Sequence, residues 1–147
     1  MKIGYFCNTT NWEKKSYTQI LEETRDIAIY CDKNKWESIW FTEHHFNHEG
    51  MENCTNPLMM STDIAARTKN IRIGQAANII TFHNPLRLAE DIASLDHLSN
   101  GRLEVGIGRG VYGREAIHMN VEADLKDQEK NKRLFEETLT IMKKDWT

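Results

Sequence analysis

The chain has 147 residues, of which 39% are hydrophobic and 28% charged, and its formal net charge is −3 at pH 7. This size and balance indicate one soluble globular domain over residues 1–147 and exclude a disordered chain. The net negative charge offers no basic surface to nucleic acid, and no apolar run is long enough to cross a membrane. The three cysteines are not closely spaced, which favours reduced thiols and a cytoplasmic protein.

Strand and helix patterns alternate along the chain. β-Branched and aromatic residues predict strands at 2–8, 36–42, 71–80 and 103–107. Helices are predicted at 57–67, 85–98 and 127–144, the last one after a polar loop. The first helix has its inward stripe at Ile20, Thr24, Ile27, Ala28 and Cys31. The last helix has Phe135, Thr138, Leu139, Met142 and Trp146 on one side. The strands begin roughly thirty residues apart, the length of a βαβ unit, so the predicted class is α/β with a parallel sheet.

Residues 89–110 show the pattern most clearly. The helix before them begins at Asn84-Pro85, because Asn is a preferred N-cap and Pro suits the first helical position. Asn100-Gly101 supplies the left-handed residues that end a helix. A short strand follows, and its glycines allow close backbone approach. Arg109 comes directly after this strand, between two glycines, which indicates an anion held near the backbone.

Two architectures accept this order of elements: a doubly wound sheet and a (β/α)8 barrel. Both place function at the carboxyl ends of the strands, and polar or small residues follow each predicted strand here. Glu43-His44-His45 follows the second strand and suits acid–base chemistry, because histidine titrates near neutral pH. The alternative is a pair of histidines that only pack or solvate a loop.

Two other kinds of site are disfavoured. His44 and His48 have the spacing of some zinc ligands, with Cys54 downstream, but no known ligand framework surrounds them, so we expect no metal centre. The glycines around Arg109 also resemble a dinucleotide fingerprint. Val111 stands where its third glycine belongs and no helix is expected to open at once, so an NAD site is disfavoured.

Taken together, these motifs resemble the bacterial luciferase-like family of flavin-dependent monooxygenases, most closely its luciferase alpha chains. The matching segments are the MKIGYF start, WFTEHHF at 40–46, GQAA at 74–77, HNP at 83–85 and the whole of 89–110. The resemblance implies a (β/α)8 barrel that uses reduced FMN and O2 to oxidise an organic substrate such as an aldehyde. In that family the oxidant is a flavin C4a-hydroperoxide.

The same resemblance implies roles for individual residues. His44 corresponds to a catalytic histidine near the flavin, with Glu43 and His45 as its supporting partners. Ala76 and Ala77 correspond to a strand edge that meets the flavin ring, often through a non-prolyl cis peptide. Arg109 corresponds to the arginine that reaches the flavin phosphate. Gly108, also expected at the cofactor, stands where luciferase alpha chains carry a reactive cysteine.

Family members have more than three hundred residues, so we expect this chain to hold the N-terminal half of the barrel, with its first and fourth strands as bare edges. An FMN-dependent monooxygenase, or a fragment of one, is the favoured interpretation, and a homodimer, a heterodimer and a separate flavin reductase are the partners considered. The alternative is a non-catalytic, luciferase-like partner subunit or flavin-binding protein. The persistence of His44 argues against that alternative, because a purely structural subunit does not need it.

Overall fold

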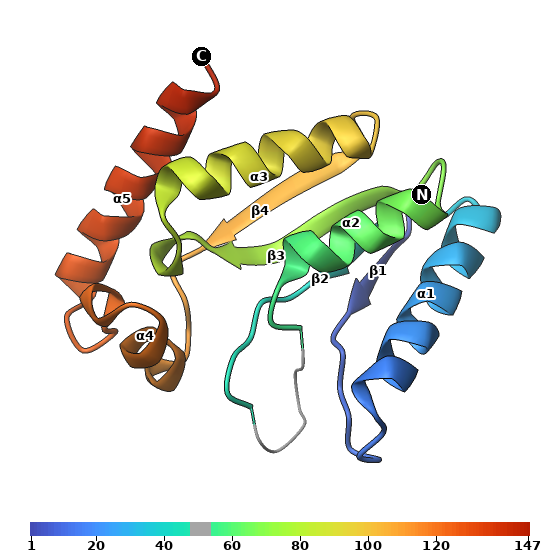
Figure 1. The fold of residues 1–147 in the computed structure, drawn as a ribbon, viewed down its shortest axis with the longest axis horizontal. Helices are drawn as coiled ribbons and strands as arrows, with labels where there is room; N and C mark the ends of the chain where they lie inside the picture. Colours follow the sequence, from blue (N-terminus) through green and yellow to red (C-terminus); the bar gives the residue numbers. More distant parts are fainter. Residues whose placement is uncertain (48–53) are drawn as a thin grey trace.

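The computed structural model describes residues 1–47 and 54–147. Within them, four parallel strands form one sheet in the order β1-β2-β3-β4. The strands are β1 (Gly4–Cys7), β2 (Ser38–Phe41), β3 (Arg72–Ile79) and β4 (Leu103–Gly108). The helices are α1 (Tyr17–Lys33), α2 (Pro57–Arg67), α3 (Pro85–Leu98), α4 (Gly113–Met119) and α5 (Gln128–Asp145), with 3₁₀ turns η1 (Ile80–Phe82) and η2 (Val121–Ala123) (Figure 1).

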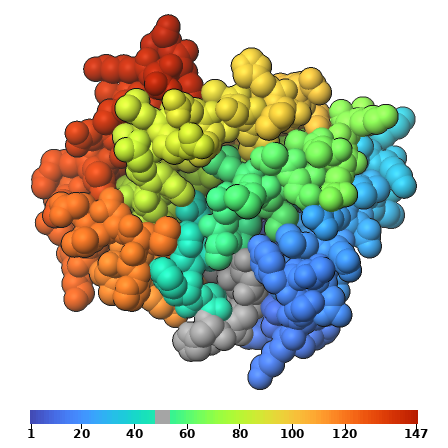
Figure 2. All heavy atoms as spheres, in the orientation of Figure 1, coloured from blue at the N-terminus to red at the C-terminus, as the bar shows by residue number. Residues whose placement is uncertain are grey.

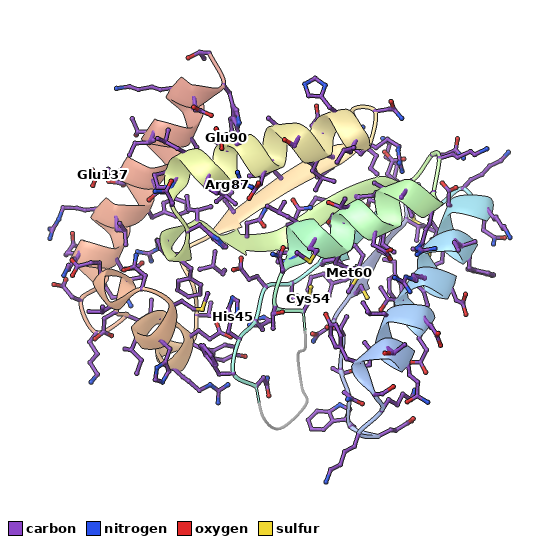
Figure 3. All side chains as sticks on the ribbon, viewed as in Figure 1. His45, Cys54, Met60, Arg87, Glu90 and Glu137 are labelled. Atoms are coloured by element: carbon purple, nitrogen blue, oxygen red, sulfur yellow. The ribbon has the colours of Figure 1, made fainter. Side chains whose placement is uncertain are left out.

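Each strand lies beside the next one in the sequence. Because parallel strands are joined by right-handed crossovers and the strand order never reverses, the connecting helices lie on the same face of the sheet. α2 and α3 lie side by side over that face (Figure 2). The sheet contributes Ile39, Phe41 and Ile73 to the core beneath them, all fully buried. Met60, in α2, and Cys54, just before that helix, belong to the same core (Figure 3). The predicted α/β class with a parallel sheet is therefore confirmed.

Local capping explains why two helices begin where the sequence predicted. The side chains of Asn56 and Asn84 accept hydrogen bonds from the first turns of α2 and α3, and a proline follows each of them. After α3, Asn100 and Gly101 adopt φ of 57° and 71°, the left-handed values expected of the predicted stop. The predicted bounds of α2 and α3 agree with the structure.

The strand bounds needed correction. The first three strands are shorter than predicted, because sheet pairing starts only where Gly4 meets Ser38 and where Ser38 meets Arg72. Ile80 belongs to η1 and not to β3. β4 instead extends one residue further, since Gly108 pairs with Ile79.

The predicted polar loop before the last helix was also wrong, because it contains α4 and η2. α4 has only seven residues and no side-chain cap at its start, so little local signal marks it, and it holds its place by burying Glu115 and Ala116. Trp146, predicted on the same side of the last helix as Phe135 and Met142, follows the end of α5 and is 44% exposed. Its indole Nε1 nevertheless donates to the Ala89 carbonyl at 3.1 Å.

In the described part of the chain, β1 and β4 are both edge strands, as expected. A hollow of about 390 Å³ lies beside β4, between α3 and α5, and is lined by apolar residues that include Val105 and Ile107. On β1, Phe6 is 55% exposed. Both edge strands of the sheet therefore lack a neighbouring strand among the described residues, and apolar residues are exposed at each of them. None of the described helices is both long and apolar enough to span a membrane.

Candidate active site

The carboxyl ends of β2, β3 and β4 meet at one edge of the sheet, because the strands are parallel and adjacent. The segments that follow them carry most of the residues singled out from the sequence. His45 lies in the segment that leaves β2, on the side of the molecule where α4 packs (Figure 3). This edge is therefore the candidate active site.

Glu43 joins two of these segments. Its side chain is 1% exposed, and its Oε1 lies 3.1 Å from His45 Nε2 and 2.9 Å from His83 Nε2. Its Oε2 accepts a hydrogen bond from the Ile79 backbone N–H at 2.6 Å. One buried carboxylate thus ties the segment after β2 to the end of β3 and to the residues that follow η1.

The electrostatics of Glu43 follow from these contacts. Burial would raise the pKa of its carboxyl, but the hydrogen bonds with His45 and His83 and from the Ile79 N–H outweigh burial and hold the pKa below its ordinary value. Glu43 is therefore an anion that accepts hydrogen bonds, and each histidine presents a protonated Nε2 to it. Glu43 and His45 were predicted as supporting partners of His44, and the contacts of Glu43 with His45 and with His83 were not predicted, although His83 lies in one of the matching motifs.

His44 meets a second buried carboxylate. Glu115 Oε1 lies 3.2 Å from His44 Nδ1 and accepts a hydrogen bond from the His45 backbone N–H at 2.8 Å. Glu115 Oε2 is buried and has no hydrogen-bond partner among the described residues. Sequence reasoning missed Glu115, because it lies 71 residues from His44 in a segment expected to be a loop.

The ends of β3 and β4 provide a strip of small residues. The Ala76–Ala77 peptide bond is cis. A Cβ at Gly106 would lie 2.1 Å from the Gln75 carbonyl oxygen, so only glycine allows the two strands to approach this closely. A Cβ at Gly108 would lie 3.4 Å from that of Ala77. The expected close approach at the glycines is confirmed, and Ala77 and Gly108 lie side by side.

Arg109 is held at this edge by its backbone. Its carbonyl oxygen accepts hydrogen bonds from Thr81 Oγ1 at 3.2 Å and from Asn131 Nδ2 at 3.3 Å. Within residues 1–47 and 54–147, its guanidinium group makes no ion pair or hydrogen bond. The structure connects Arg109 to η1 and α5 and not directly to His44 or His45. Its cationic group is thus available to an anion.

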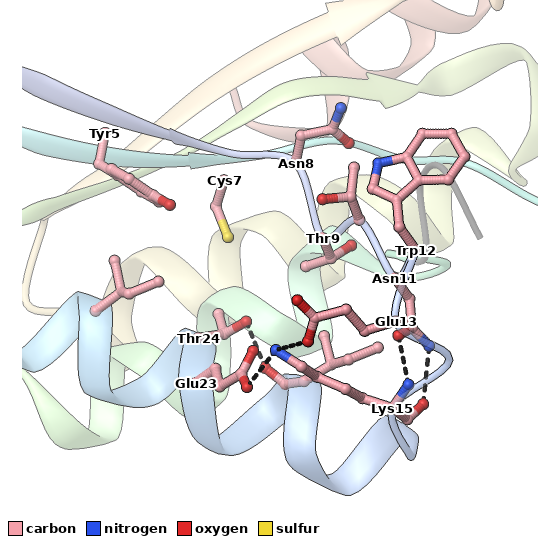
Figure 4. Close-up of a pocket in the computed structure, with 13 residues that line it drawn as sticks. Tyr5, Cys7, Asn8, Thr9, Asn11, Trp12, Glu13, Lys15, Glu23 and Thr24 are labelled. Atoms are coloured by element: carbon pink, nitrogen blue, oxygen red, sulfur yellow. Dashed lines mark hydrogen bonds and ion pairs between the residues drawn. The ribbon is translucent and has the colours of Figure 1, made fainter.

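Two other features, the metal-ligand spacing and a cavity beside α1, carry no candidate site among the described residues. Residues 1–47 and 54–147 contain no group of three or more metal-ligating side chains, and His48 lies outside them. A cavity of about 280 Å³ lies between α1 and the segment after β1 (Figure 4). Its charged side chains bind one another, because Lys15 pairs with both Glu13 and Glu23. Burial raises the pKa of the Cys7 thiol in its wall to about 11, which makes that thiol a poor nucleophile.

Comparison with known proteins identifies relatives of this chain. The chain is 36% identical over 107 residues to the alkanal monooxygenase beta chain of Vibrio harveyi, covering 72% of this chain and 32% of that protein. It is 30% identical over 115 residues to the alkanal monooxygenase alpha chain of Photorhabdus laumondii, covering 78% and 32%. The chain thus spans about a third of the length of these curated relatives.

A solved structure shows the same arrangement. The oxygenating constituent of 3,6-diketocamphane monooxygenase from Pseudomonas putida, in complex with FMN, matches 99% of this chain and 39% of its own, with a TM-score of 0.91 and 25% identity. The four strand–helix units are therefore those of a (β/α)8 barrel of this kind, as predicted. The family model described as luciferase-like monooxygenase matches residues 1–147. This chain belongs to the luciferase-like monooxygenase family, whose members are flavin-dependent.

Proposed function

We propose that this chain provides the cofactor-facing part of an FMN-dependent monooxygenase that oxidises an organic substrate, such as an aldehyde, with O2. The observation that carries the proposal is the composition of one sheet edge. At or just after the carboxyl ends of three neighbouring strands lie a histidine paired with a buried carboxylate, a strip of small residues and an arginine with no partner among the described residues. Relatives named as alkanal monooxygenases and an FMN-bound solved structure of the same fold support it.

The donor set at this edge fits FMN. Ala76 is exposed, and Ala77 and Gly108 beside it have little or no side chain, so a planar ring can lie against this strip of backbone. The Arg109 guanidinium suits a phosphate, because its forked N–H groups match phosphate oxygens. Ala76, Ala77, Gly108 and Arg109 would then hold the cofactor. When bound and reduced, FMN would supply the two electrons that activate O2.

His44 is the proposed catalytic residue. Its Nδ1 faces the Glu115 carboxylate, so its Nε2 is the nitrogen through which it exchanges a proton with bound molecules. Its side chain is 13% exposed, which keeps most of the ring away from bulk water. Glu43 and His45 support it by holding the segment after β2 in place. A proton acceptor here assists oxygen transfer, because the aldehyde carbon loses its hydrogen as the acid forms.

Flavin binding is the first test. The whole protein is titrated with oxidised FMN and, without oxygen, with reduced FMN, and binding is followed by absorbance and fluorescence. We expect saturable binding, and Arg109→Ala to weaken it about 10- to 100-fold, the worth of one charge-assisted contact. Arg114→Ala removes an exposed arginine of α4 and should leave the affinity unchanged. Failure of both flavin forms to bind would refute the proposal, and equal affinities for the two variants would remove the phosphate role of Arg109.

Turnover is the second test. Chemically reduced FMN, O2 and an aliphatic aldehyde are mixed with the protein, and the products are identified by mass spectrometry. One oxygen atom of O2 should enter the carboxylic acid while the other leaves as water and the flavin is oxidised. A requirement for an added flavin reductase when NADH replaces the reduced flavin would identify that reductase as a partner. Flavin binding without any oxygenated product would favour the non-catalytic subunit.

A further inference from the structure

We propose that Glu115 is a positioning residue that holds His44 in the tautomer with the proton on Nδ1. Its contact with His44 is a property of this fold, whereas its catalytic consequence rests on the function proposed above. The inference deepens that function, because it names the group that decides which nitrogen of His44 exchanges protons.

The geometry of Glu115 supports a fixed orientation. The carboxylate is 1% exposed, and a single oxygen, Oε1, receives both the His45 backbone N–H at 2.8 Å and His44 Nδ1 at 3.2 Å. The backbone hydrogen bond holds the carboxylate against the segment that carries His44. Because a carboxylate accepts hydrogen bonds and donates none, Nδ1 must carry the proton of a neutral His44.

Further contacts hold α4 against the same segment. The rings of Tyr112 and His44 lie 5.4 Å apart, and the rings of Phe46 and His118 meet edge to face at 5.3 Å. The first pair involves the residue before α4 and the second involves its last turn. Ala116, next to Glu115, is fully buried. Glu115 is therefore presented by a helix that packs along the segment after β2.

A purely structural role would not require a carboxylate. An amide oxygen could accept the hydrogen bond from the His45 backbone equally well. Glu115 also keeps a second oxygen, Oε2, buried without a hydrogen-bond partner in the described part of the chain, and such burial of a polar atom is costly. The role of the carboxylate at the adjacent His44 ring explains this cost, because an anion at Nδ1 stabilises the imidazolium that forms when Nε2 takes up a proton.

The test compares Glu115→Ala and Glu115→Gln with the unaltered protein. Glu122→Gln is the matched control, since it removes a carboxylate from an exposed side chain of η2 that pairs with Lys130. Nitrogen-15 spectra of the histidine rings, recorded on the whole protein without flavin, report the tautomer of His44. We expect a protonated Nδ1 in the unaltered protein and in Glu122→Gln, retention in Glu115→Gln, and a shift toward Nε2-protonated His44 in Glu115→Ala.

Kinetics provide the second readout. With reduced FMN and aldehyde, Glu115→Ala should lower kcat about 10- to 100-fold with KM nearly unchanged, the range known for carboxylates that orient metal-bound histidines through the second ring nitrogen. Glu115→Gln should lower kcat less and alter its pH profile, because it keeps the acceptor and loses the charge. Circular dichroism checks the fold, and Glu115→Gln serves as the test if the alanine variant unfolds.

The outcomes separate this inference from the proposed function. A His44 tautomer that is Nε2-protonated in the unaltered protein, or unchanged in a folded Glu115→Ala, overturns the positioning role even if the protein turns over aldehyde. The expected tautomers in a protein that binds no flavin would support the positioning contact and refute the monooxygenase proposal. Unchanged kcat and pH profile in both variants would also overturn the inference.

Discussion

The two ends of the sheet use buried and half-buried charges in different ways. At the carboxyl ends, Glu43 and Glu115 face histidine side chains, and the buried oxygens Thr42 Oγ1 and Glu115 Oε2 have no partner among the described residues. At the amino ends, Asp32 and Arg102 bind almost only backbone groups. The buried carboxylates at the carboxyl ends therefore join titratable groups to each other, whereas Asp32 and Arg102 at the amino ends use charge to hold the chain in place.

The amino end illustrates structural charge. Arg102 donates to the carbonyls of Ser99, Ile71 and Ala65 and to Thr68 Oγ1, at distances of 2.7 to 3.0 Å. These partners lie at the ends of α2 and α3 and just before β3, so one guanidinium holds three segments together and compensates two helix C-termini. Asp32 accepts from the backbone N–H groups of residues 69–71.

The difference teaches how to separate function from stability in this fold. Charges that bind the backbone stabilise the chain and leave no group able to exchange a proton. A carboxylate that binds a histidine engages one ring nitrogen, and proton exchange can then take place at the other nitrogen. Parallel barrels place their active sites at the carboxyl ends, and the distribution of partners here agrees with that rule.

The largest expected effect is on catalysis at the carboxyl end. His44→Ala should lower turnover of the whole protein about 10²- to 10⁴-fold, the usual contribution of a general base, while flavin binding is largely kept. Steady-state kinetics and FMN titration measure the two quantities. His97→Ala, which alters an exposed histidine in the last turn of α3, should leave turnover unchanged. Equal turnover in the two variants would assign His44 to packing alone.

The next effect is on stability at the amino end. Arg102→Ala removes four hydrogen bonds and leaves three carbonyl groups without their donor. We expect the free energy of unfolding to fall by about 3 kcal/mol, because hydrogen bonds to charged groups contribute about 1.5–3 kcal/mol each and partly compensate when lost together. Urea unfolding measures it. Weakened FMN affinity in the folded variant would contradict the division between the two ends.

Glu43 should contribute to stability as well as to the candidate site. It lies at the carboxyl end of the sheet, and both of its carboxylate oxygens accept hydrogen bonds. Glu43→Gln should lower the free energy of unfolding by about 2 kcal/mol at pH 7. The folded state lowers the pKa of this carboxyl, so its contribution is present above the ordinary glutamate range and is lost as the pH falls through the folded-state pKa. Unfolding curves at pH 7 and pH 4 should therefore show a smaller difference between variant and parent at pH 4. A difference that does not change with pH would assign the effect to packing.

The smallest expected effect concerns Asp32. Burial raises the pKa of this carboxyl, but hydrogen bonds from the backbone of residues 69–71 outweigh it and lower the pKa overall. Asp32→Asn should lower the free energy of unfolding by about 1 kcal/mol at pH 7, because the group is partly exposed and its interactions are screened. The difference should shrink as the pH falls below the ordinary aspartate range. Turnover and flavin affinity should not change, and a loss of either would place function at both ends.

Much of the fold was predictable because its signals are local. The Asn-Pro pairs before α2 and α3 specify their starts within a few residues, and Asn100-Gly101 ends α3 at once. Spacing of the strands along the chain was enough to predict the parallel sheet and the edge that carries the candidate site. His44, Glu43 and Arg109 could be selected as candidates for the same reason, since each lies within three residues of the end of a strand.

The sequence by itself determined the alternation of strands and helices, the capped helix bounds and the edge of the sheet at which polar residues gather. Only the tertiary structure decided which of those residues meet. Glu115 reaches His44 across 71 positions, and Glu43 reaches His83 across 40. Such contacts depend on α4, which has little local signal, and on the packing of separate loops. The strand-end position of His44 is a local property, but its proton chemistry depends on a partner that only folding brings to it.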